Sequence, residues 1–265
     1  MAEKRFKKIV RAVLLRLLVY SVLLITVPLA LGYVFMEKML LPEVKSSECS
    51  GNIRLISGNA DLDVFFYPPQ PGKPVILYSH GNAETLASIQ PLCREFIRQG
   101  YGVLAYDYAG YGFSGGRASE KQVYCDVQSV YRFLTVTKSV LPADIIVMGF
   151  SVGSGASCFI AEKNPGIKAL VLIAPFASAI EVMLPFPLPG NRFNNAQRLK
   201  NCIVPVLIMH GTADRVIPIR NSWILYRNSA AGQKKLITVE NAGHNDIFDF
   251  MGHGFYKKLQ DFISF

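Results

Sequence analysis

The sequence predicts an α/β protein in which helices cover a mostly parallel sheet, preceded by an apolar N-terminal helix. Short runs of Val, Ile and Leu alternate along the chain with stretches in which apolar residues recur at helical spacing. The runs are continuously apolar, which indicates strands covered on both faces. Residues 17–36 contain no charged side chain, whereas residues 1–16 contain six Lys and Arg. The chain therefore divides into a membrane-associated N-terminus and one α/β domain.

Seven apolar runs are predicted as strands, at residues 62–67, 74–79, 102–108, 144–150, 169–174, 205–210 and 235–240. Helical spacing predicts helices at residues 83–99, 119–137, 152–163, 219–231 and 247–265. Residues 177–202 are rich in Pro and aromatic residues and show no clear period, so we expect a small cap over the sheet. Residues 51–265, with the cap included, have the length of a single domain.

The N-terminus is predicted to anchor the protein in a membrane. We divide it into a basic tail (1–16), a transmembrane helix (17–36) and a connector (37–50). A helix rises about 1.5 Å per residue, so this uncharged segment can cross a hydrocarbon core of about 30 Å. The basic tail keeps the N-terminus in the cytoplasm and places the domain in the periplasm, the lumen or the exterior. The alternative is a cleaved signal peptide, for which Ala30-Leu31-Gly32 offers a small-x-small site.

Composition argues against several other classes of function. The net charge of +9 is concentrated in the basic tail, as is typical of membrane insertion, so no nucleic-acid partner is expected. The five cysteines form no C-x-x-C pair and no Cys/His cluster, so no metal site is expected. Neither G-x-x-x-x-G-K nor G-x-G-x-x-G stands at a strand–helix turn, and no cofactor is expected.

A G-x-S-x-G motif around Ser151 predicts a nucleophile elbow. Gly149 and Gly153 flank Ser151, and the motif joins a strongly apolar strand directly to a helix of small residues. The sharp turn exposes the hydroxyl, and the glycines let helix and strand approach each other. A second copy of the motif surrounds Ser114, but it lies in a Gly-rich loop, where a serine is usually a turn residue.

A serine nucleophile needs an imidazole base and a carboxylate to orient it. His244 follows the last predicted strand, and Asp214 follows the one before it, which gives the chain order Ser, Asp, His of the α/β hydrolases. Asp107 and Asp246 are the competing carboxylates. Asp107 precedes the nucleophile and Asp246 lies very close to His244 along the chain, so both are predicted to order loops. The expected catalytic triad is Ser151, Asp214 and His244.

An oxyanion needs two backbone donors. One donor is the amide of Val152, the residue after the nucleophile. The other is the amide of Asn82, in the loop after the strand predicted at residues 74–79. His80 is expected to brace this loop through a backbone hydrogen bond, and Gly81 to permit its turn.

Five motifs in this order resemble the Bem46-like branch of the α/β-hydrolase-domain serine hydrolases: LYSHGNAE (77–84), YDYAGYGFSGG (106–116), GFSVGSG (149–155), HGTADRVIP (210–218) and AGHND (242–246). The resemblance covers residues 60–265 and implies an α/β-hydrolase fold. It also implies a membrane-associated enzyme that cleaves acyl esters or thioesters, including lipids and S-acylated proteins. The substrate, and the choice between ester, thioester and amide, stay open.

The expected function is therefore a membrane-anchored serine hydrolase whose partners are an acyl substrate and membrane lipid. Two alternatives are a hydrolase-like binding protein without chemistry and a serine peptidase on the same fold. The sequence leaves the oligomeric state open. Within the cap, the apolar residues Met183, Leu184, Phe186 and Leu188 are the candidate acyl pocket, with a cluster packed on the sheet as the alternative.

Overall fold

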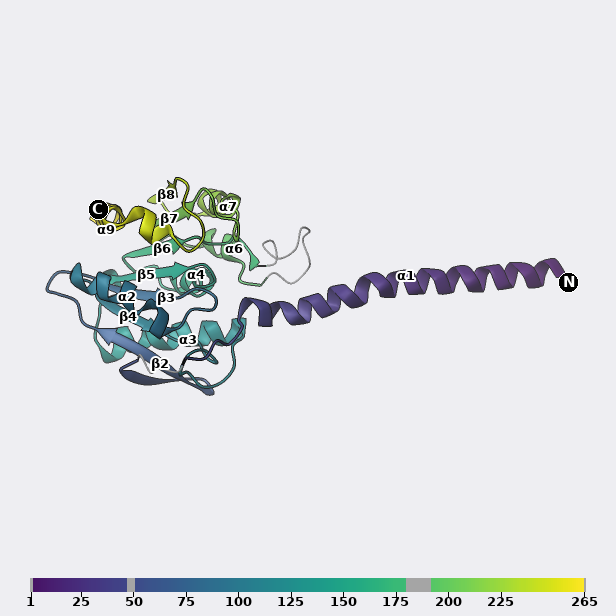
Figure 1. Cartoon of the computed structure of the whole chain (residues 1–265), viewed down its shortest axis with the longest axis horizontal. Coiled ribbons are helices and arrows are strands. Elements are labelled where there is room, and N and C mark those ends of the chain that lie inside the picture. Colours follow the sequence, from purple (N-terminus) through teal and green to yellow (C-terminus); the bar gives the residue numbers. More distant parts are fainter. Residues whose placement is uncertain (1, 47–50, 180–191, 265) are drawn as a thin grey trace. The chain divides into compact units, whose positions relative to one another are not determined.

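The computed structural model describes residues 2–46, 51–179 and 192–264, in two compact units, Met1–Leu40 and Leu41–Phe265. The first unit is a single helix, α1 (Ala2–Leu40), drawn in purple in Figure 1. Its stretch Arg5–Leu40 is long and apolar enough to cross a membrane, a property that signal sequences share. The helix extends beyond residues 17–36 at both ends, because the flanking Lys, Arg, Leu, Met and Ala residues are good helix formers.

The second unit is built on an eight-stranded sheet with the order β1-β2-β4-β3-β5-β6-β7-β8. β1 and β2 are antiparallel to each other, β2 is antiparallel to β4, and all other neighbours are parallel. This arrangement confirms the predicted fold class. The strands are β1 (Ile53–Ser57), β2 (Ala60–Tyr67), β3 (Val75–Ser79), β4 (Gly102–Tyr106), β5 (Ile145–Phe150), β6 (Ala169–Ile173), β7 (Val206–Gly211) and β8 (Lys234–Val239).

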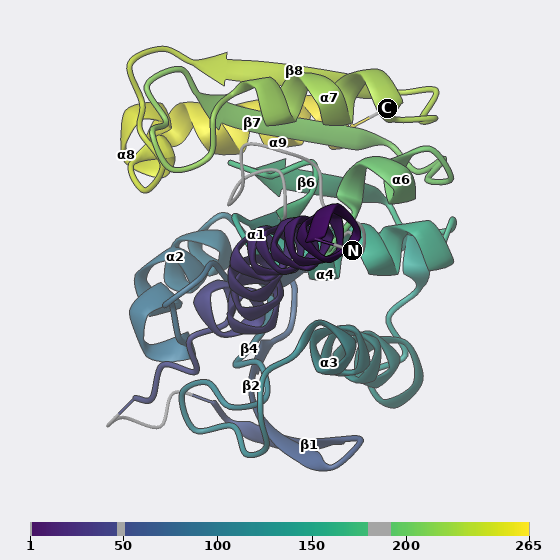
Figure 2. The ribbon, with the colours of Figure 1, turned by 90° about the vertical axis from the view of Figure 1, so that its right-hand side faces the viewer.

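Helices cover both faces of the sheet (Figure 2). On one face lie α2 (Leu86–Arg98), α8 (Ile247–Met251) and α9 (His253–Ile263), and on the other lie α3 (Glu120–Arg132), α4 (Gly153–Lys163), α6 (Asn195–Leu199) and α7 (Arg220–Asn228).

Side-chain caps fix where two of these helices begin. Thr85 and Ser88 form a capping box at α2, and the Ser119 side chain accepts a hydrogen bond from Gln122 N at α3. After α3 the chain continues through a wide π turn, Phe133–Thr137, and later a short 3₁₀ turn, Pro142–Asp144.

Two predicted elements differ from the structure. The helix predicted at 247–265 is divided into α8 and α9 at Gly252, whose φ of +47° and ψ of −134° no helix contains. The predicted cap contains the short helix α6 near its C-terminal end. The four candidate acyl-pocket residues, Met183, Leu184, Phe186 and Leu188, lie outside the described residues.

The core lies between the sheet and its helices and holds the ends of the central strands in place. β3, β4, β5, β6 and β7 are buried along their whole length. One cluster joins Tyr78 and Met148 of the sheet to Phe96 of α2 and Phe255 of α9. Burial of each such side chain contributes about 1.5–3 kcal/mol. The parallel strands end together at one edge of the sheet, hereafter the carboxyl-terminal edge, where loops of different origin meet.

Candidate active site

Ser151 stands at a strained turn between β5 and α4. Its φ is +51°, in the left-handed region that a residue with a Cβ rarely adopts, and its amide donates to Ile173 O over 3.0 Å. The flanking glycines permit this turn. A Cβ on Gly149 would collide with the Gly153 carbonyl, and a Cβ on Gly153 would collide with the Ser79 carbonyl. Strand and helix therefore approach closely enough to hold the Ser151 hydroxyl at the carboxyl-terminal edge of the sheet.

His244 and Asp214 form a hydrogen-bonded chain with Ser151. His244 Nε2 lies 3.0 Å from Ser151 Oγ, and His244 Nδ1 lies 2.7 Å from Asp214 Oδ2. Because Asp214 accepts the Nδ1 proton, Nε2 is left as an acceptor for the serine hydroxyl. The imidazole also packs on the Phe150 ring, with 5.2 Å between centroids. The structure thus brings together the three residues that the sequence predicts as a triad.

The surroundings of Asp214 keep it ionised. Burial alone would raise the pKa of its carboxyl, but hydrogen bonds from His210, His244 and the Ile217 amide together lower that pKa below its ordinary value. The amides of Val216 and Ile217 both donate to Oδ1 over 2.8 Å. An ionised Asp214 can stabilise the imidazolium that forms when His244 takes a proton.

His210 is a site residue that sequence reasoning did not assign. Its Nε2 lies 3.1 Å from Asp214 Oδ2 and 2.8 Å from Ile217 O, while its Nδ1 lies 2.6 Å from Ser222 Oγ. His210 therefore contacts the same carboxylate oxygen of Asp214 as His244 does. The spacing of four residues between His210 and Asp214 allows this contact, but the contact also requires the turn after β7 to fold back.

The loop after β3, residues 80–84, carries the predicted oxyanion donor Asn82 and is hereafter the oxyanion loop. His80 Nδ1 donates to Gly81 O over 2.9 Å, as expected for a bracing residue, and Tyr108 Oη donates to His80 O over 2.7 Å. Ala83 has a φ of +60°, and the Gly81 amide donates to Glu84 Oε2 over 2.6 Å. These contacts hold the loop in a tight turn at the carboxyl-terminal edge of the sheet.

Val152, the second predicted donor, lies at the N-terminus of α4, where unpaired amides and the helix dipole favour negative charge. Within the described ranges, no group of three or more His, Cys, Asp or Glu side chains is arranged to hold a metal ion.

The chain is similar to several known proteins. Residues 70–194 and 191–250 match a family model described as a serine aminopeptidase, S33, within the hydrolases. The α/β-hydrolase domain-containing protein 17B of Homo sapiens is 30% identical over 215 residues, covering 80% of this chain and 73% of the relative. This chain belongs to the α/β-hydrolase family. The resemblance to its serine hydrolase branch is thereby confirmed.

Other relatives and solved structures extend the comparison of this hydrolase. The α/β-hydrolase domain-containing protein 17C of Xenopus tropicalis is 32% identical over 211 residues, covering 77% of this chain and 66% of the relative. An esterase of Pyrococcus furiosus has a TM-score of 0.68 at 16% identity and covers 80% of this chain and 90% of its own. Est1E of Butyrivibrio proteoclasticus, solved with ferulic acid, has a TM-score of 0.67 at 18% identity and covers 80% of this chain and 100% of its own. At these identities the two structures show the fold.

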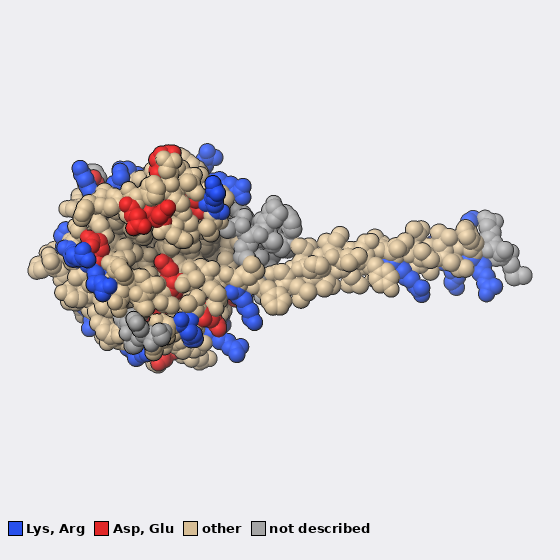
Figure 3. Space-filling model, in the orientation of Figure 1, with Lys and Arg blue, Asp and Glu red and all other residues tan. Residues whose placement is uncertain are grey.

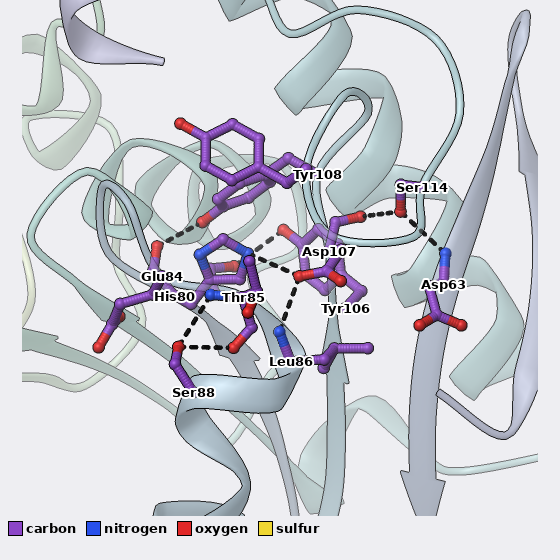
Figure 4. Close-up of polar contacts among 12 residues, drawn as sticks. Asp63, His80, Glu84, Thr85, Leu86, Ser88, Tyr106, Asp107, Tyr108 and Ser114 are labelled. Atoms are coloured by element: carbon purple, nitrogen blue, oxygen red, sulfur yellow. Dashed lines mark hydrogen bonds and ion pairs between the residues drawn. The ribbon is translucent and has the colours of Figure 1, made fainter. Parts of the chain in front are cut away.

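The second G-x-S-x-G motif has a structural role in the hydrolase (Figure 4). Ser114 is buried, and its Oγ donates to Asp107 O over 2.7 Å and accepts from Asp63 N over 2.9 Å. Asp107 accepts from Leu86 N over 2.8 Å and lies 3.6 Å from His80 Nε2. Asp246 accepts from Gly243 N over 2.6 Å. The two competing carboxylates therefore order loops, as the sequence indicates.

The connector contributes to the same region of the hydrolase. The Gly112 amide donates to Val44 O over 2.7 Å, and the Glu43 carboxylate accepts from Ala118 N over 2.9 Å. Lys45 Nζ donates to Ser114 O over 3.1 Å. The Gly-rich loop that these contacts hold also contains Tyr111, whose hydroxyl lies 3.5 Å from Asn82 Oδ1. The connector thus supports the loop that lies against the oxyanion loop.

Proposed function

We propose that the chain is a membrane-anchored serine hydrolase that cleaves acyl ester or thioester bonds through an acyl-enzyme. The observation that carries this proposal is the hydrogen-bonded chain from Ser151 Oγ through His244 to Asp214, with separations of 3.0 and 2.7 Å. Few arrangements other than nucleophilic catalysis require a serine at a strained turn, an imidazole acceptor and a carboxylate at such separations. α1 supports the membrane anchor by its length and apolar composition.

In this mechanism Ser151 Oγ attacks the substrate carbonyl carbon while its proton passes to His244 Nε2. The carbonyl oxygen becomes an oxyanion, which the amides of Val152 and Asn82 stabilise. His244 then donates the proton to the leaving oxygen or sulfur, and the bond from that atom to the acyl carbon breaks. A water molecule repeats the sequence on the acyl-enzyme: it loses a proton to His244, attacks the acyl carbon, and Ser151 leaves with that proton.

Lipid-like or S-acylated molecules are the substrates that we propose for this site. An anchor holds the enzyme at the bilayer, where acyl chains are concentrated, and the cap sequence supplies apolar residues such as Phe186 and Leu188. The esterases among the solved neighbours, one of them holding ferulic acid, support ester chemistry. In an apolar acyl pocket each buried CH₂ contributes up to about 0.8 kcal/mol.

The experiment is an acyl series of p-nitrophenyl esters from acetate to palmitate, measured as kcat/KM. We expect the value to rise with chain length until the pocket is full, and Phe186→Ala or Leu188→Ala to lower it for long chains alone. A profile that peaks at acetate and is unchanged in both variants would reject the long-chain substrate.

A serine peptidase is the second candidate, because the matching family model is described as a serine aminopeptidase. Matched p-nitroanilides of amino acids, assayed beside the esters, separate the two functions. Faster turnover of the anilides would replace the esterase by a peptidase with the same three residues. A binding protein without chemistry would turn over neither.

A further inference from the structure

An open cleft of about 860 Å³ lies beside the triad, between α2 and the pair α8 and α9. None of the three triad residues lines the cleft, but residues next to them do. Asn82 comes from the oxyanion loop, Phe150 precedes Ser151, and Asn245 follows His244. Figure 3 shows this face, which is hollowed between the upper and lower parts of the domain. The cleft therefore borders the oxyanion loop and the chain neighbours of Ser151 and His244.

The walls of the cleft are apolar and firmly packed. They include Ile89, Leu92, Phe248, Phe255 and Tyr256, and all five belong to the core cluster or pack directly against it. Ile89 is 3% exposed and Phe255 is 1% exposed. The cleft is therefore preformed, and an apolar or aromatic group entering it would meet aromatic faces without a rearrangement of the core.

The charges that line the cleft are mostly negative. Glu84, Glu95 and Asp249 contribute three carboxylates, and Arg98 is the one Lys or Arg among the described lining residues. Arg98 is already paired with Glu95, at 2.6 Å between Nη1 and Oε2. The surrounding domain has the opposite balance, since residues 41–265 hold 21 Lys and Arg against 17 Asp and Glu. Acidic side chains stand around the hollow in Figure 3.

The position of His244 indicates which half of the substrate enters. In the proposed mechanism His244 donates its proton to the leaving group, so the leaving atom lies against Nε2. Phe150 packs on the His244 ring, and Asn245 is its neighbour in the chain; both line the cleft. A leaving group that lies against Nε2 can therefore reach the cleft past Phe150 and Asn245.

We propose that this cleft binds the leaving group, and that the leaving group is a basic amphiphilic peptide segment. Its Lys or Arg side chains would lie near Glu84 and Asp249, and its apolar side chains would pack on Phe248 and Tyr256. Aromatic walls beside carboxylates suit such cations through both charge and ring faces. The inference rests on the proposed function, because it needs an acyl group to be cleaved from a peptide side chain.

The test uses the full-length protein in an uncharged detergent and two S-octanoyl-cysteine peptides that differ only in flanking residues, two Lys in one and two Glu in the other. We expect kcat/KM to be about fivefold higher for the lysine peptide at low salt, as one or two exposed charge contacts allow. The preference should shrink in high salt, because exposed charges are screened.

The variants Asp249→Asn and Asp249→Lys test whether the preference for the lysine peptide arises in the cleft. We expect the first substitution to reduce the ratio of the two kcat/KM values and the second to abolish or reverse it. Asp261→Asn makes the same charge change on an exposed residue of α9 outside the cleft and should keep the wild-type ratio.

A protein that reacts with a fluorophosphonate and hydrolyses both peptides equally would overturn the cleft assignment and leave the proposed function standing. Equal ratios in the Asp249 and Asp261 variants would also overturn it. A protein that neither reacts with the probe nor hydrolyses either peptide would refute the proposed function, and the cleft assignment would fail with it.

Discussion

At the residue scale, the site depends on contacts that differ sharply between similar side chains. Ser151 and Ser114 occupy the same five-residue motif, yet Ser151 faces an imidazole and Ser114 is held between two backbone groups. Backbone strain of the kind at Ser151 costs of order 1–3 kcal/mol and is kept where a function needs it. The context of each motif, strand to helix or Gly-rich loop, was therefore enough to separate them in the sequence.

Alanine substitutions of the two serines should separate their roles. Ser151→Ala removes the nucleophile and should lower ester turnover by about a thousandfold or more. Ser114→Ala removes the buried hydroxyl that bonds to Asp63 N and Asp107 O, and should lower the free energy of unfolding by about 1–3 kcal/mol, while kcat changes little. Turnover and chemical denaturation of both variants provide the check. Equal loss of turnover in the folded variants would contradict the assignment.

Stability should report the ionisation of Asp214. The folded protein holds the pKa of this carboxyl below its unfolded value, so the ionised group stabilises the fold at any pH above the unfolded pKa of about 3.9. That contribution is lost as the pH falls toward the folded pKa. The difference in unfolding free energy between wild type and Asp214→Asn should thus shrink as the pH falls from about 5 to below about 4. Chemical denaturation of both proteins across this pH range measures the difference in unfolding free energy. A difference that grew in acid would contradict the lowered pKa of Asp214.

His210 marks the limit of prediction at this scale. Chain order and strand ends were enough to propose Ser151, Asp214 and His244. The contact of His210 with Asp214 depends on how the turn after β7 folds back, and the sequence does not specify that turn.

At the element scale, the fully buried strands were predictable and the partly exposed or broken elements were not. β3 to β7 are continuous runs of apolar residues, a pattern typical of strands that are buried on both faces. β1 is partly exposed and carries the charged Arg54, so it lacks the continuous apolar run by which the buried strands were predicted. The division between α8 and α9 depends on one glycine whose surroundings permit a helix on either side.

The close approach of α4 to β3 gives a prediction at the same scale. Gly153→Ala would place a Cβ against the Ser79 carbonyl, which must shift, so we expect the free energy of unfolding to fall by about 1–3 kcal/mol. Turnover should fall as well, because Ser151 sits on the same turn. Gly232→Ala, where a Cβ meets nothing within 4 Å, is the control and should be nearly neutral. Chemical denaturation measures the free energy of unfolding of both variants. Equal losses would show that α4 and β3 do not pack tightly at Gly153.

At the scale of the whole molecule, the chain combines a hydrolase domain with an N-terminal helix able to cross a membrane. The connector between them packs on the Gly-rich loop near the oxyanion loop, through Glu43, Val44 and Lys45. Sequence reasoning treated residues 37–50 as a simple link, because a short polar segment gives no sign of where it docks.

The basic tail predicts the orientation of the protein in the membrane. If the tail stays in the cytoplasm, a reporter fused after Phe265 should lie on the far side of the membrane, and the mature protein should still begin at Met1 or Ala2. Protease protection of the reporter and N-terminal sequencing provide the measurement. A mature chain that begins near Tyr33 would indicate a cleaved signal and a secreted enzyme.

The central claim is that His244 and Asp214 activate Ser151 as a nucleophile, and it can be tested without knowledge of the substrate. The full-length protein in detergent is treated with a fluorophosphonate probe, and the modified residue is identified by peptide mass spectrometry, with His244→Ala and Ser151→Ala as matched variants. The account predicts a single adduct on Ser151, lost in Ser151→Ala and strongly slowed in His244→Ala. A folded wild-type protein that stays unmodified, or that is modified at Ser114, would contradict it.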